Sequence, residues 1–387
     1  MTGTSPIRRH QSRGLLTPTS LKKNLCKTLL KTMCIVLGIL ILALLAYIVY
    51  LYASYYRIED NQELVVEAPV DDTTTGAAAV LATDTEYSAV TYNIGFGAYL
   101  PDYSFFMDGG TSSWAESPET VQYAINGAGE LVKSLDPDFA LIQEIDLDAT
   151  RSYHTDEYAM LRNLLPEYTT VFAQNYDSAF LFYPFTQPHG SSRAGLGLFS
   201  KYPVSSALRR SFPISTSFSK FFDLDRCYSV SRIPVDNGKE LVIFNLHMSA
   251  YGNSDEIRKG QIEMLCNDMA KEYEAGNYVL CGGDFNHDLK ASEEDTESCE
   301  SWAFPFPRTE LPEHFAFCLD LLTDEERTAL WNSARNADME YVPGVTYTLT
   351  LDGFIISDNI ECLSYENVNT GYSYSDHDPV KVEFVLR

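Results

Sequence analysis

Several short motifs that mark large enzyme classes are missing from this sequence of 387 residues. There is no G-x-S-x-G turn for a nucleophilic serine and no H-E-x-x-H pair for zinc. A Walker A loop ending in Gly-Lys-Ser or Gly-Lys-Thr and a dinucleotide-binding G-x-G-x-x-G are absent as well. These absences remove support for acyl transfer and for work driven by nucleotides.

Cysteine is scarce, and no two cysteines stand in a C-x-x-C pattern. Two of the eight, Cys26 and Cys34, lie in or beside a long apolar run near the amino terminus. The other six allow up to three disulfides, whose pairing the sequence leaves open: Cys227, Cys266, Cys281, Cys299, Cys318 and Cys362. Without paired spacing, buried or disulfide-bonded thiols are favoured over zinc binding or redox chemistry.

Positive charge is also in short supply, with 28 Lys and Arg residues against 54 Asp and Glu residues. Seven of the basic residues precede the apolar run, so the rest of the chain has 21 and a formal charge of −33. A surface this acidic repels phosphate polymers at long range. The charge therefore weakens the case for a protein that grips long nucleic acid without divalent cations.

The apolar run itself predicts a membrane span. Residues 32–56 contain no charged side chain over 25 positions, which is enough helix to cross a hydrocarbon layer of about 30 Å. A cleaved signal peptide is the competing interpretation, but the run is long for one, and Tyr55 and Tyr56 stand where small cleavage-site residues are expected. The sequence favours a signal anchor.

The charges that flank the run predict its orientation. The segment before it contains no acidic residue and seven basic ones: Arg8, Arg9, Arg13, Lys22, Lys23, Lys27 and Lys31. Such an excess of positive charge holds a segment in the cytoplasm. We therefore expect a single-pass plasma-membrane protein with a basic cytoplasmic tail over 1–31, a transmembrane helix over 32–56 and the remainder outside the cell.

After the span, residues 57–86 are acidic and lack sustained periodicity, which predicts a stalk or linker. From residue 87 to 387, apolar strands alternate with helical stretches, which is typical of an α/β sandwich. The clearest predicted strands are 88–94, 139–142, 240–247, 278–281, 352–356 and 380–386. Helices are expected after the caps Ser117 and Ser254 and at the capping box formed by Thr323 and Glu326.

Polar residues recur where these apolar strands begin or end. They are Asn93, Glu144, His247, Asp284 with Asn286, Asp352, and Asp376 with His377. Carboxylate and amide oxygens are hard ligands that suit Mg²⁺, Mn²⁺ or Ca²⁺ better than zinc. Together with histidines near an aspartate, they predict phosphoryl chemistry assisted by a divalent cation.

Six short strings carry a resemblance to a known family. They are Thr91-Tyr92-Asn93-Ile94, Gln143-Glu144, Asn245-Leu246-His247, Gly283-Asp284-Phe285-Asn286, Asp352-Gly353-Phe354 and Ser375-Asp376-His377-Asp378-Pro379-Val380. In this order the chain resembles the endonuclease/exonuclease/phosphatase superfamily, whose fold is like that of deoxyribonuclease I. The resemblance implies a four-layer α/β sandwich, with two facing mixed β-sheets flanked by helices and an active site at one end.

The resemblance also implies roles for these side chains. Glu144 is the expected chief metal ligand, joined by Asn93 and Asp376. His377 is the expected general base, and Asp352 holds its ring in the useful tautomer. The other three motif residues serve the phosphoryl group: His247 binds or protonates its oxygen, while Asp284 and Asn286 position the nucleophile and stabilise the transition state.

The implied function is a metal-dependent hydrolase that cleaves phosphodiesters, with a lipid head group such as sphingomyelin favoured by the membrane location. An extracellular nuclease is the alternative, and a non-catalytic surface binding module of the same fold is a rival from another class. The sequence departs from the nuclease branches because no second carboxylate is recognisable as a partner for His247. No protein partner is inferred.

Other residues are weaker candidates. His287, Asp288 and Arg193 are assigned to loops, and His154, His189 and His314 have no recognisable partner in the sequence. The aromatic content is 13%, and most of these rings are expected to pack in the core. Two clusters are alternative candidates for membrane-facing loops: Phe218, Phe221 and Phe222, and Trp302, Phe304 and Phe306.

Overall fold

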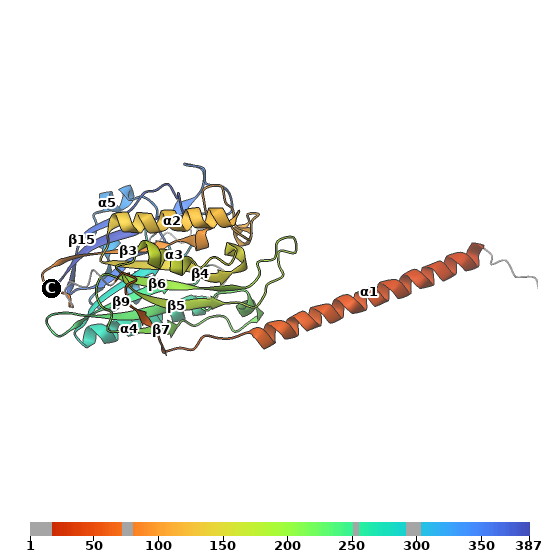
Figure 1. The fold of residues 1–387 in the computed structure, drawn as a ribbon, viewed down its shortest axis with the longest axis horizontal. Helices are drawn as coiled ribbons and strands as arrows, with labels where there is room; N and C mark the ends of the chain where they lie inside the picture. Colours follow the sequence, from red (N-terminus) through yellow and green to blue (C-terminus); the bar gives the residue numbers. More distant parts are fainter. Residues whose placement is uncertain (1–17, 72–79, 251–254, 292–302) are drawn as a thin grey trace, which may run out of the picture. The chain divides into compact units, whose positions relative to one another are not determined.

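A computed structural model describes residues 18–71, 80–250, 255–291 and 303–387, and it divides the chain at Tyr55 into two units. The first unit contains one long helix, α1 (Pro18–Ser54), seen in Figure 1. Its stretch Leu25–Ser54 is long and apolar enough to cross a membrane, and most of its large apolar side chains are exposed. The helix has the properties of a membrane anchor, as the apolar run predicts.

The second unit, Tyr56–Arg387, is built on two mixed seven-stranded sheets. The first sheet has the order β1 (Gln62–Glu63), β7 (Ser206–Ser211), β8 (Cys227–Pro234), β9 (Glu240–His247), β10 (Tyr278–Asp284), β14 (Asp352–Ser357) and β11 (Phe315–Phe317). The second has the order β15 (Ile360–Asn367), β16 (Val380–Leu386), β3 (Glu86–Asn93), β4 (Phe139–Ala149), β6 (Ser192–Ser200), β5 (Thr169–Asp177) and β2 (Val66–Glu67). A short pair, β12 (Ala334–Arg335) with β13 (Thr348–Leu349), lies outside both sheets.

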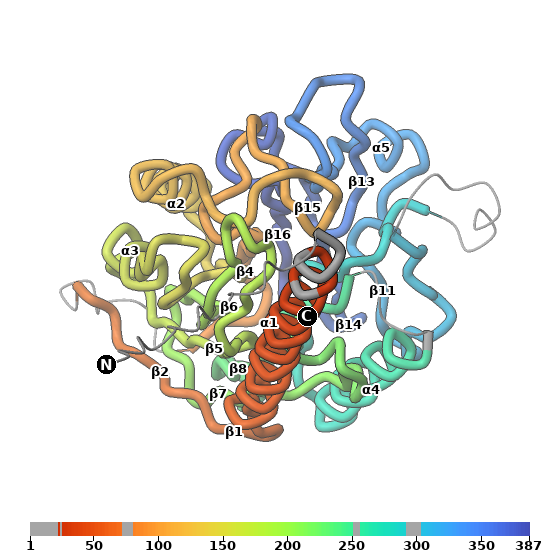
Figure 2. The backbone as a smooth tube through the Cα atoms, turned by 90° about the vertical axis from the view of Figure 1, so that its right-hand side faces the viewer, coloured from red at the N-terminus to blue at the C-terminus, as the bar shows by residue number. Residues whose placement is uncertain are grey.

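Helices cover the outer faces of the two sheets. Figures 1 and 2 both place α2 (Pro118–Leu135) and α3 (Glu157–Leu164) on one side of the unit and α4 (Asp255–Glu274) on the other. A fourth helix, α5 (Asp324–Ala329), is short and begins with the predicted capping box. The four layers confirm the predicted α/β sandwich.

The core lies between the sheets because each sheet contributes apolar side chains to a common cluster. Leu141 and Leu198 of the second sheet belong to the same buried cluster as Ile243 and Leu280 of the first. Alternate residues of β4 point the other way, and Ile142 packs in a separate cluster under α2 and α3. Burial on both faces explains why these strands read as continuous apolar runs.

Strand register brings the predicted polar residues to one end of the sandwich. In the parallel pair β9–β10, His247 stands opposite Asp284, and in the antiparallel pair β10–β14, Asp284 stands opposite Asp352. In the other sheet, the parallel strands β3 and β4 align Asn93 with Gln143, directly before Glu144. The motifs therefore gather because their strands are neighbours in space.

The described parts of 57–86, for which the sequence predicts a stalk, lie along the sheets. Strand β1 pairs with β7 and β2 pairs with β5, so both extend sheet edges. The Ile58 N–H donates to Asp225 Oδ2 at 2.6 Å, and the Leu81 side chain is fully buried. Unpaired groups at a sheet edge readily accept another strand, which accounts for the pairing of β1 and β2.

Local sequence explains most helix ends. Ser117 accepts a hydrogen bond from the Thr120 N–H, with Pro118 at the first helical position, as the sequence predicts. Past the end of α4, Gly276 has a positive φ of 81°, a conformation that favours glycine. The predicted cap Ser254 lies outside the described residues.

Candidate active site

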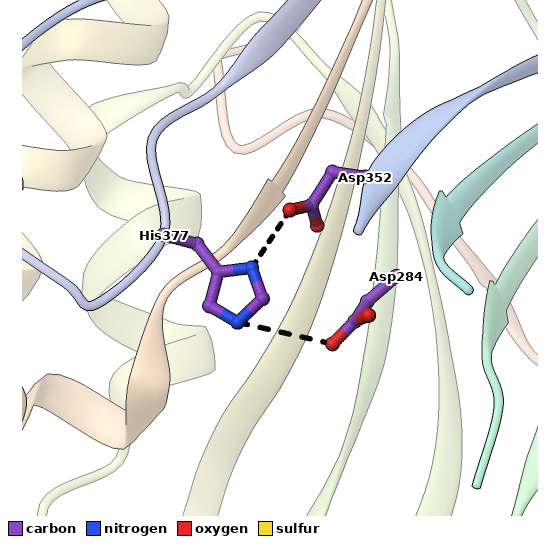
Figure 3. Close-up of side chains that lie close together, drawn as sticks. All are labelled: Asp284, Asp352 and His377. Carbon is purple, nitrogen blue, oxygen red and sulfur yellow. Dashed lines mark hydrogen bonds and ion pairs between the residues drawn. The ribbon is translucent and has the colours of Figure 1, made fainter. Parts of the chain in front are cut away.

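A buried histidine stands between two buried aspartates, as Figure 3 shows. His377 Nδ1 lies 2.7 Å from Asp352 Oδ2, and its Nε2 lies 3.9 Å from Asp284 Oδ2. Ser333 Oγ donates to the same Asp352 oxygen at 2.8 Å and accepts the Asp352 N–H at 3.1 Å. Asp352 is therefore fixed by Ser333 and holds the imidazole with Nδ1–H towards itself, which leaves Nε2 as the proton acceptor.

The charges around His377 decide its protonation. Burial alone lowers the pKa of this imidazole, but the nearby carboxylates of Asp352, Asp284 and Asp376 outweigh burial and raise its pKa well above the usual value. Burial raises the pKa of Asp284 to about 7, a rise that His377 opposes and Asp352 reinforces. These carboxylates therefore favour a proton on His377, which can act as a general base only at a pH high enough to remove that proton.

The second histidine, His247, has the opposite tendency. Burial lowers the pKa of this imidazole well below its usual value, and the positive charge of Arg226 adds to the effect. Its Nε2 lies 3.5 Å from Asp284 Oδ2 and 3.8 Å from Glu144 Oε1. No described residue forms a hydrogen bond with its buried Nδ1, in agreement with the absence of a second carboxylate motif.

Glu144 reaches the site through a distortion of β4. The pairing of β4 with β6 is interrupted between Ile142 and Ile145, and Glu144 has a φ of 56° in the left-handed region. Such a conformation costs of order 1–3 kcal/mol for a residue other than glycine and is found most often at functional sites. The distortion is a β-bulge, which turns one side chain out of the strand's regular alternation.

Asn93 links the carboxylates of the two sheets. Its Nδ2 donates to Glu144 Oε1 and to Asp284 Oδ2, both at 3.1 Å, while its Oδ1 accepts the Gly95 N–H at 3.0 Å. A role for Oδ1 as a metal ligand beside these carboxylates requires the amide to turn over, because its nitrogen faces them. The geometry places Asn93 at the predicted position but assigns its nitrogen to the carboxylates.

The loop that carries Asp376 packs closely on the end of β3. Ser375 Oγ donates to the Asn93 carbonyl at 2.9 Å and accepts the His377 N–H at 3.2 Å. A Cβ at Gly95 would lie 3.2 Å from Asp376 Oδ1 and 2.7 Å from the Tyr99 ring, so only glycine fits there. Burial raises the pKa of Asp376, opposed by His377 and Arg335 and reinforced by Glu144.

Asn286 fixes Asp284 from the other side. Its backbone N–H donates to Asp284 Oδ1 at 2.8 Å, and its Nδ2 donates to the Met248 carbonyl at 2.9 Å. Its φ of 50° is again in the left-handed region, which asparagine tolerates better than most residues. The motif Gly283-Asp284-Phe285-Asn286 thus forms a tight turn in which Asp284 and Asn286 line the cavity, while Phe285 packs in the core.

Six of the eight predicted residues line one cavity of about 610 Å³: Glu144, His247, Asp284, Asn286, Asp376 and His377. The other two, Asn93 and Asp352, stand behind this wall in hydrogen-bond contact with it. A hard divalent cation fits this donor set, because carboxylate oxygens come from Glu144 at the bulge of β4, Asp284 at the end of β10 and Asp376 in the loop before β16. Among the described residues, Asp284, Asp352 and His377 also have ligand atoms within 4.8 Å of one another.

Several cavity residues carry no sequence signal. Arg226 is 6% exposed, and its Nε and Nη1 have no hydrogen-bond partner among the described residues. Arg151 is held by Asp146 at 2.8 Å, and Arg335 and Tyr176 complete the wall. These side chains come from separate elements and belong to no recognisable motif, so their spacing in the sequence could not identify them. The same holds for Ser333.

The weaker candidates lie elsewhere or serve the wall. Among the described residues, the His287 ring forms its hydrogen bond outside the cavity: its Nδ1 lies 2.7 Å from the Phe285 carbonyl oxygen. Arg193 forms an ion pair with Asp148 on the surface. His154 and His314 have aspartate partners that the sequence does not indicate, at 2.5 and 2.6 Å. His189 lines the cavity, and burial lowers the pKa of its imidazole to about 3.

The fold and the site define a class of protein, the two-sheet α/β sandwiches with a buried His–Asp pair and carboxylates at the strand ends. The sequence pattern of the Endonuclease/Exonuclease/phosphatase family matches residues 90–322, and the chain belongs to this family. Members of the family are typically metal-dependent phosphoester hydrolases. No curated protein sequence matches the chain.

Solved structures share the fold at low sequence identity. An endonuclease/exonuclease/phosphatase from Beutenbergia cavernae is 15% identical with a TM-score of 0.56, over 78% of this chain and 72% of that one. TDP2 from D. rerio, complexed with a single-strand DNA product, is 13% identical with a TM-score of 0.52, over 78% and 99%. ANGEL2, a 2′,3′-cyclic phosphatase in complex with adenosine-2′,3′-vanadate, is 13% identical with a TM-score of 0.53, over 78% and 96%.

Proposed function

We propose that this protein is a metal-dependent phosphodiesterase that hydrolyses lipid head groups, such as that of sphingomyelin, or another small phosphodiester at the outer face of the plasma membrane. The observation that carries the proposal is the His377–Asp352 pair, whose Nε2 faces a cavity lined by the carboxylates of Glu144, Asp284 and Asp376. A base held in one tautomer beside a binding site for hard cations is the arrangement that phosphoester hydrolysis requires.

The proton transfers follow from the ring environments. His377 Nε2 takes a proton from a water molecule as its oxygen attacks phosphorus, and Asp352 stabilises the resulting imidazolium. The phosphorus–oxygen bond to the leaving alcohol breaks, and the leaving oxygen acquires a proton. Asp284, with its pKa of about 7, can supply it, and the neutral His247 beside it is proposed to bind a phosphoryl oxygen.

The expected cofactor is Mg²⁺, with Mn²⁺ or Ca²⁺ as alternatives of the same hard class. Glu144 and Asp376 would hold the ion, with Asn93 joining if its amide turns. When bound, a divalent cation neutralises the non-bridging phosphoryl oxygens. Asp284, which shares the Asn93 amide nitrogen with Glu144, is proposed to orient the nucleophile together with Asn286.

The size and charge of the domain support a small substrate. A cavity of about 610 Å³ lies within the range of roughly 300–1,000 Å³ usual for small-ligand sites. The formal charge of −33 outside the span and tail opposes long-range attraction of nucleic acid. A nuclease remains the second candidate, because TDP2, which shares the fold, was solved with a DNA product.

The location rests on α1 and its flanking charges. We propose that α1 anchors the chain, with the basic tail over 1–31 in the cytoplasm and the domain outside the cell. We further propose that the catalytic domain begins near residue 57, since the described parts of 57–86 pair with its sheets.

The test is a comparison of substrates with the full chain in detergent. Initial rates are measured on bis(p-nitrophenyl) phosphate, sphingomyelin, and single- and double-stranded DNA, each with Mg²⁺ and with EDTA. Turnover of the small diester and the lipid that requires Mg²⁺ supports the proposal. Turnover of DNA alone favours the nuclease, and ligand binding without turnover under any divalent ion favours a binding module of the same fold.

A further inference from the structure

An uncharged, aromatic segment joins β5 to β6. Residues 178–192 contain no Asp, Glu, Lys or Arg over 15 positions, although the chain as a whole is strongly charged. Within this segment, Phe182 is 49% exposed, Tyr183 61% and Phe185 84%. Single exposed apolar side chains are ordinary, but three large ones within four residues mark an interaction surface.

The segment is a built structure. Leu181 and Gly190 exchange two backbone hydrogen bonds, at 2.9 and 3.0 Å, which close it into a hairpin-like loop. Trp114 Nε1 donates to the Pro188 carbonyl at 2.7 Å, and Ser113 Oγ donates to the Gln187 carbonyl at 2.6 Å. Figure 1 shows it extending beyond the ends of β5 and β6. Exposure of the aromatic rings is therefore maintained by hydrogen bonds at the base of the loop.

This aromatic surface is continuous with the catalytic cavity. The Tyr183 ring lies 5.8 Å from that of Phe106, which in turn lies 6.0 Å from His189 in the cavity wall. On two other loops, the exposed side chains of Met107 and Phe222 line the cavity as well. We call this surface the apolar rim: Met107, Phe182, Tyr183, Phe185, Phe218 and Phe222.

The short connection between α1 and the domain limits how far the apolar rim can lie from a bilayer that holds α1. Helix α1 ends at Ser54, and the Ile58 N–H is already bonded to Asp225, whose neighbours Leu224 and Arg226 line the cavity. Ile58 follows Ser54 by four residues, and four extended residues span at most about 14 Å. A bilayer that holds α1 is therefore an apolar surface always available to the domain.

Charge selects the kind of lipid. The −33 formal charge of the chain beyond the tail and span disfavours anionic membranes and nucleic acid. Residues 178–192 offer no Lys or Arg to bind them, and Lys220 is the one basic residue between Phe218 and Phe222. Phenylalanine and tyrosine are suited to the interface of an electrically neutral bilayer, where apolar rings are buried and the tyrosine hydroxyl stays hydrated.

We infer that the apolar rim inserts into the head-group layer of a zwitterionic bilayer and that the cavity takes its phosphodiester substrate from that layer. The inference rests on the proposed function for the chemistry, but the insertion does not depend on it. Insertion is measured by fluorescence and hydrolysis by activity, so that the failure of one is distinguishable from the failure of the other.

Insertion is tested by fluorescence with the full chain reconstituted in phosphatidylcholine vesicles, with and without brominated phosphatidylcholine as quencher. The variant F185W places a reporter in the rim, and Y123W is the matched control, because Tyr123 on α2 is 59% exposed and lies outside the rim. After subtraction of the wild-type signal, we expect at least a twofold quenching of F185W and none of Y123W. Quenching of F185W no stronger than that of Y123W would overturn the inference.

Substrate delivery is tested by activity. The substitution Phe185→Ser removes one inserted ring and is expected to lower Mg²⁺-dependent hydrolysis of sphingomyelin in phosphatidylcholine vesicles by about tenfold. Hydrolysis of soluble bis(p-nitrophenyl) phosphate should not change, because Phe185 lies outside the cavity wall. A Phe185→Ser rate equal to the wild-type rate on both substrates would contradict delivery. Quenching without any lipid hydrolysis would refute the lipid substrate and leave the insertion standing.

Discussion

Histidines hydrogen-bonded to an aspartate through Nδ1 occur at three places in the described residues, and their environments differ. His377–Asp352, His314–Asp358 and His154–Asp148 have nitrogen–oxygen distances of 2.7, 2.6 and 2.5 Å. The first pair is buried and borders the cavity, whereas the side chains of the other two are largely exposed to solvent. A histidine–aspartate hydrogen bond is common to all three places. We therefore expect the reactivity of His377 to come from its burial and from the carboxylates around it.

The first prediction concerns the pH profile. Asp352 raises the pKa of His377, and the base works only when its ring is deprotonated, so activity should fall as the pH drops through that pKa. Asp352→Asn should lower kcat and move the acidic limb of the kcat profile to lower pH. Profiles on bis(p-nitrophenyl) phosphate measure this, and Asp358→Asn is the matched control. An unmoved limb in Asp352→Asn would contradict the assigned base.

The second prediction concerns Ser333, which touches Asp352 but not the cavity wall. Ser333→Ala removes a hydrogen bond to a buried carboxylate and leaves the Asp352 N–H without its partner, so we expect a loss of about 1–3 kcal/mol in unfolding free energy. Urea denaturation measures the loss. Ser364→Ala breaks an exposed bond to Glu383 of the same 2.8 Å length and should change stability far less.

At the level of elements, the site depends on strand pairings that bring distant motifs together. Gly283 in β10 has a φ of 149°, and a Cβ there would lie 2.1 Å from the Leu246 carbonyl oxygen of β9. This close approach keeps Asp284 opposite His247. Gly283 is therefore required for the close pairing of β9 and β10, and it directly precedes Asp284 of the site.

The third prediction follows from this contact. Gly283→Ala should push β9 from β10 and destabilise the domain by about 1–3 kcal/mol or more, with loss of activity. Gly238→Ala is the control, because Gly238 also has a positive φ, of 80°, but has open space around its Cβ position. Thermal unfolding of the two variants separates the steric effect from the cost of the backbone conformation. Equal destabilisation would show that the strand contact is unimportant.

The sequence predicts central strands better than edge strands, for a physical reason. The predicted strands 240–247 and 380–386 coincide with β9 and β16, because both are largely buried apolar runs. Strand β15 was not predicted, since it lies at an edge with exposed positions and little periodicity. Strand order stays out of reach of the sequence because it depends on pairings between distant segments.

The same distinction applies to the site. Motif residues such as Asp284 and His377 stand at strand boundaries, where the pattern of the sequence makes them visible. Ser333 and Arg226 have no such pattern and reach the site through the fold alone. The bulge at Glu144 was also not predictable, because it is an interruption of pairing with β6.

At the scale of the whole molecule, an acidic domain carries a cluster of buried carboxylates that a cation would stabilise. Burial raises the pKa of both Asp284 and Asp376, which means that their ionised forms lack sufficient compensation. A divalent cation that binds the folded state alone should therefore stabilise it by mass action.

The fourth prediction is that Mg²⁺ raises the thermal unfolding temperature of the full chain relative to EDTA. At about 100 times its Kd, the ion should add about 2.7 kcal/mol of unfolding free energy. Glu144→Gln removes the charge of the expected chief ligand and should abolish the shift. Glu383→Gln, which changes a carboxylate away from the cavity, is the control. A shift of equal size in Glu144→Gln would place the ion elsewhere.

The most direct test of the proposed chemistry is the rate of bis(p-nitrophenyl) phosphate hydrolysis by wild type, His377→Ala and His314→Ala in Mg²⁺. Loss of a general base usually costs about 10²–10⁴-fold in rate, so His377→Ala should be reduced to that extent. His314→Ala, which removes the exposed partner of Asp358, should retain the wild-type rate. Wild-type turnover by His377→Ala would contradict the assignment of this histidine as the base.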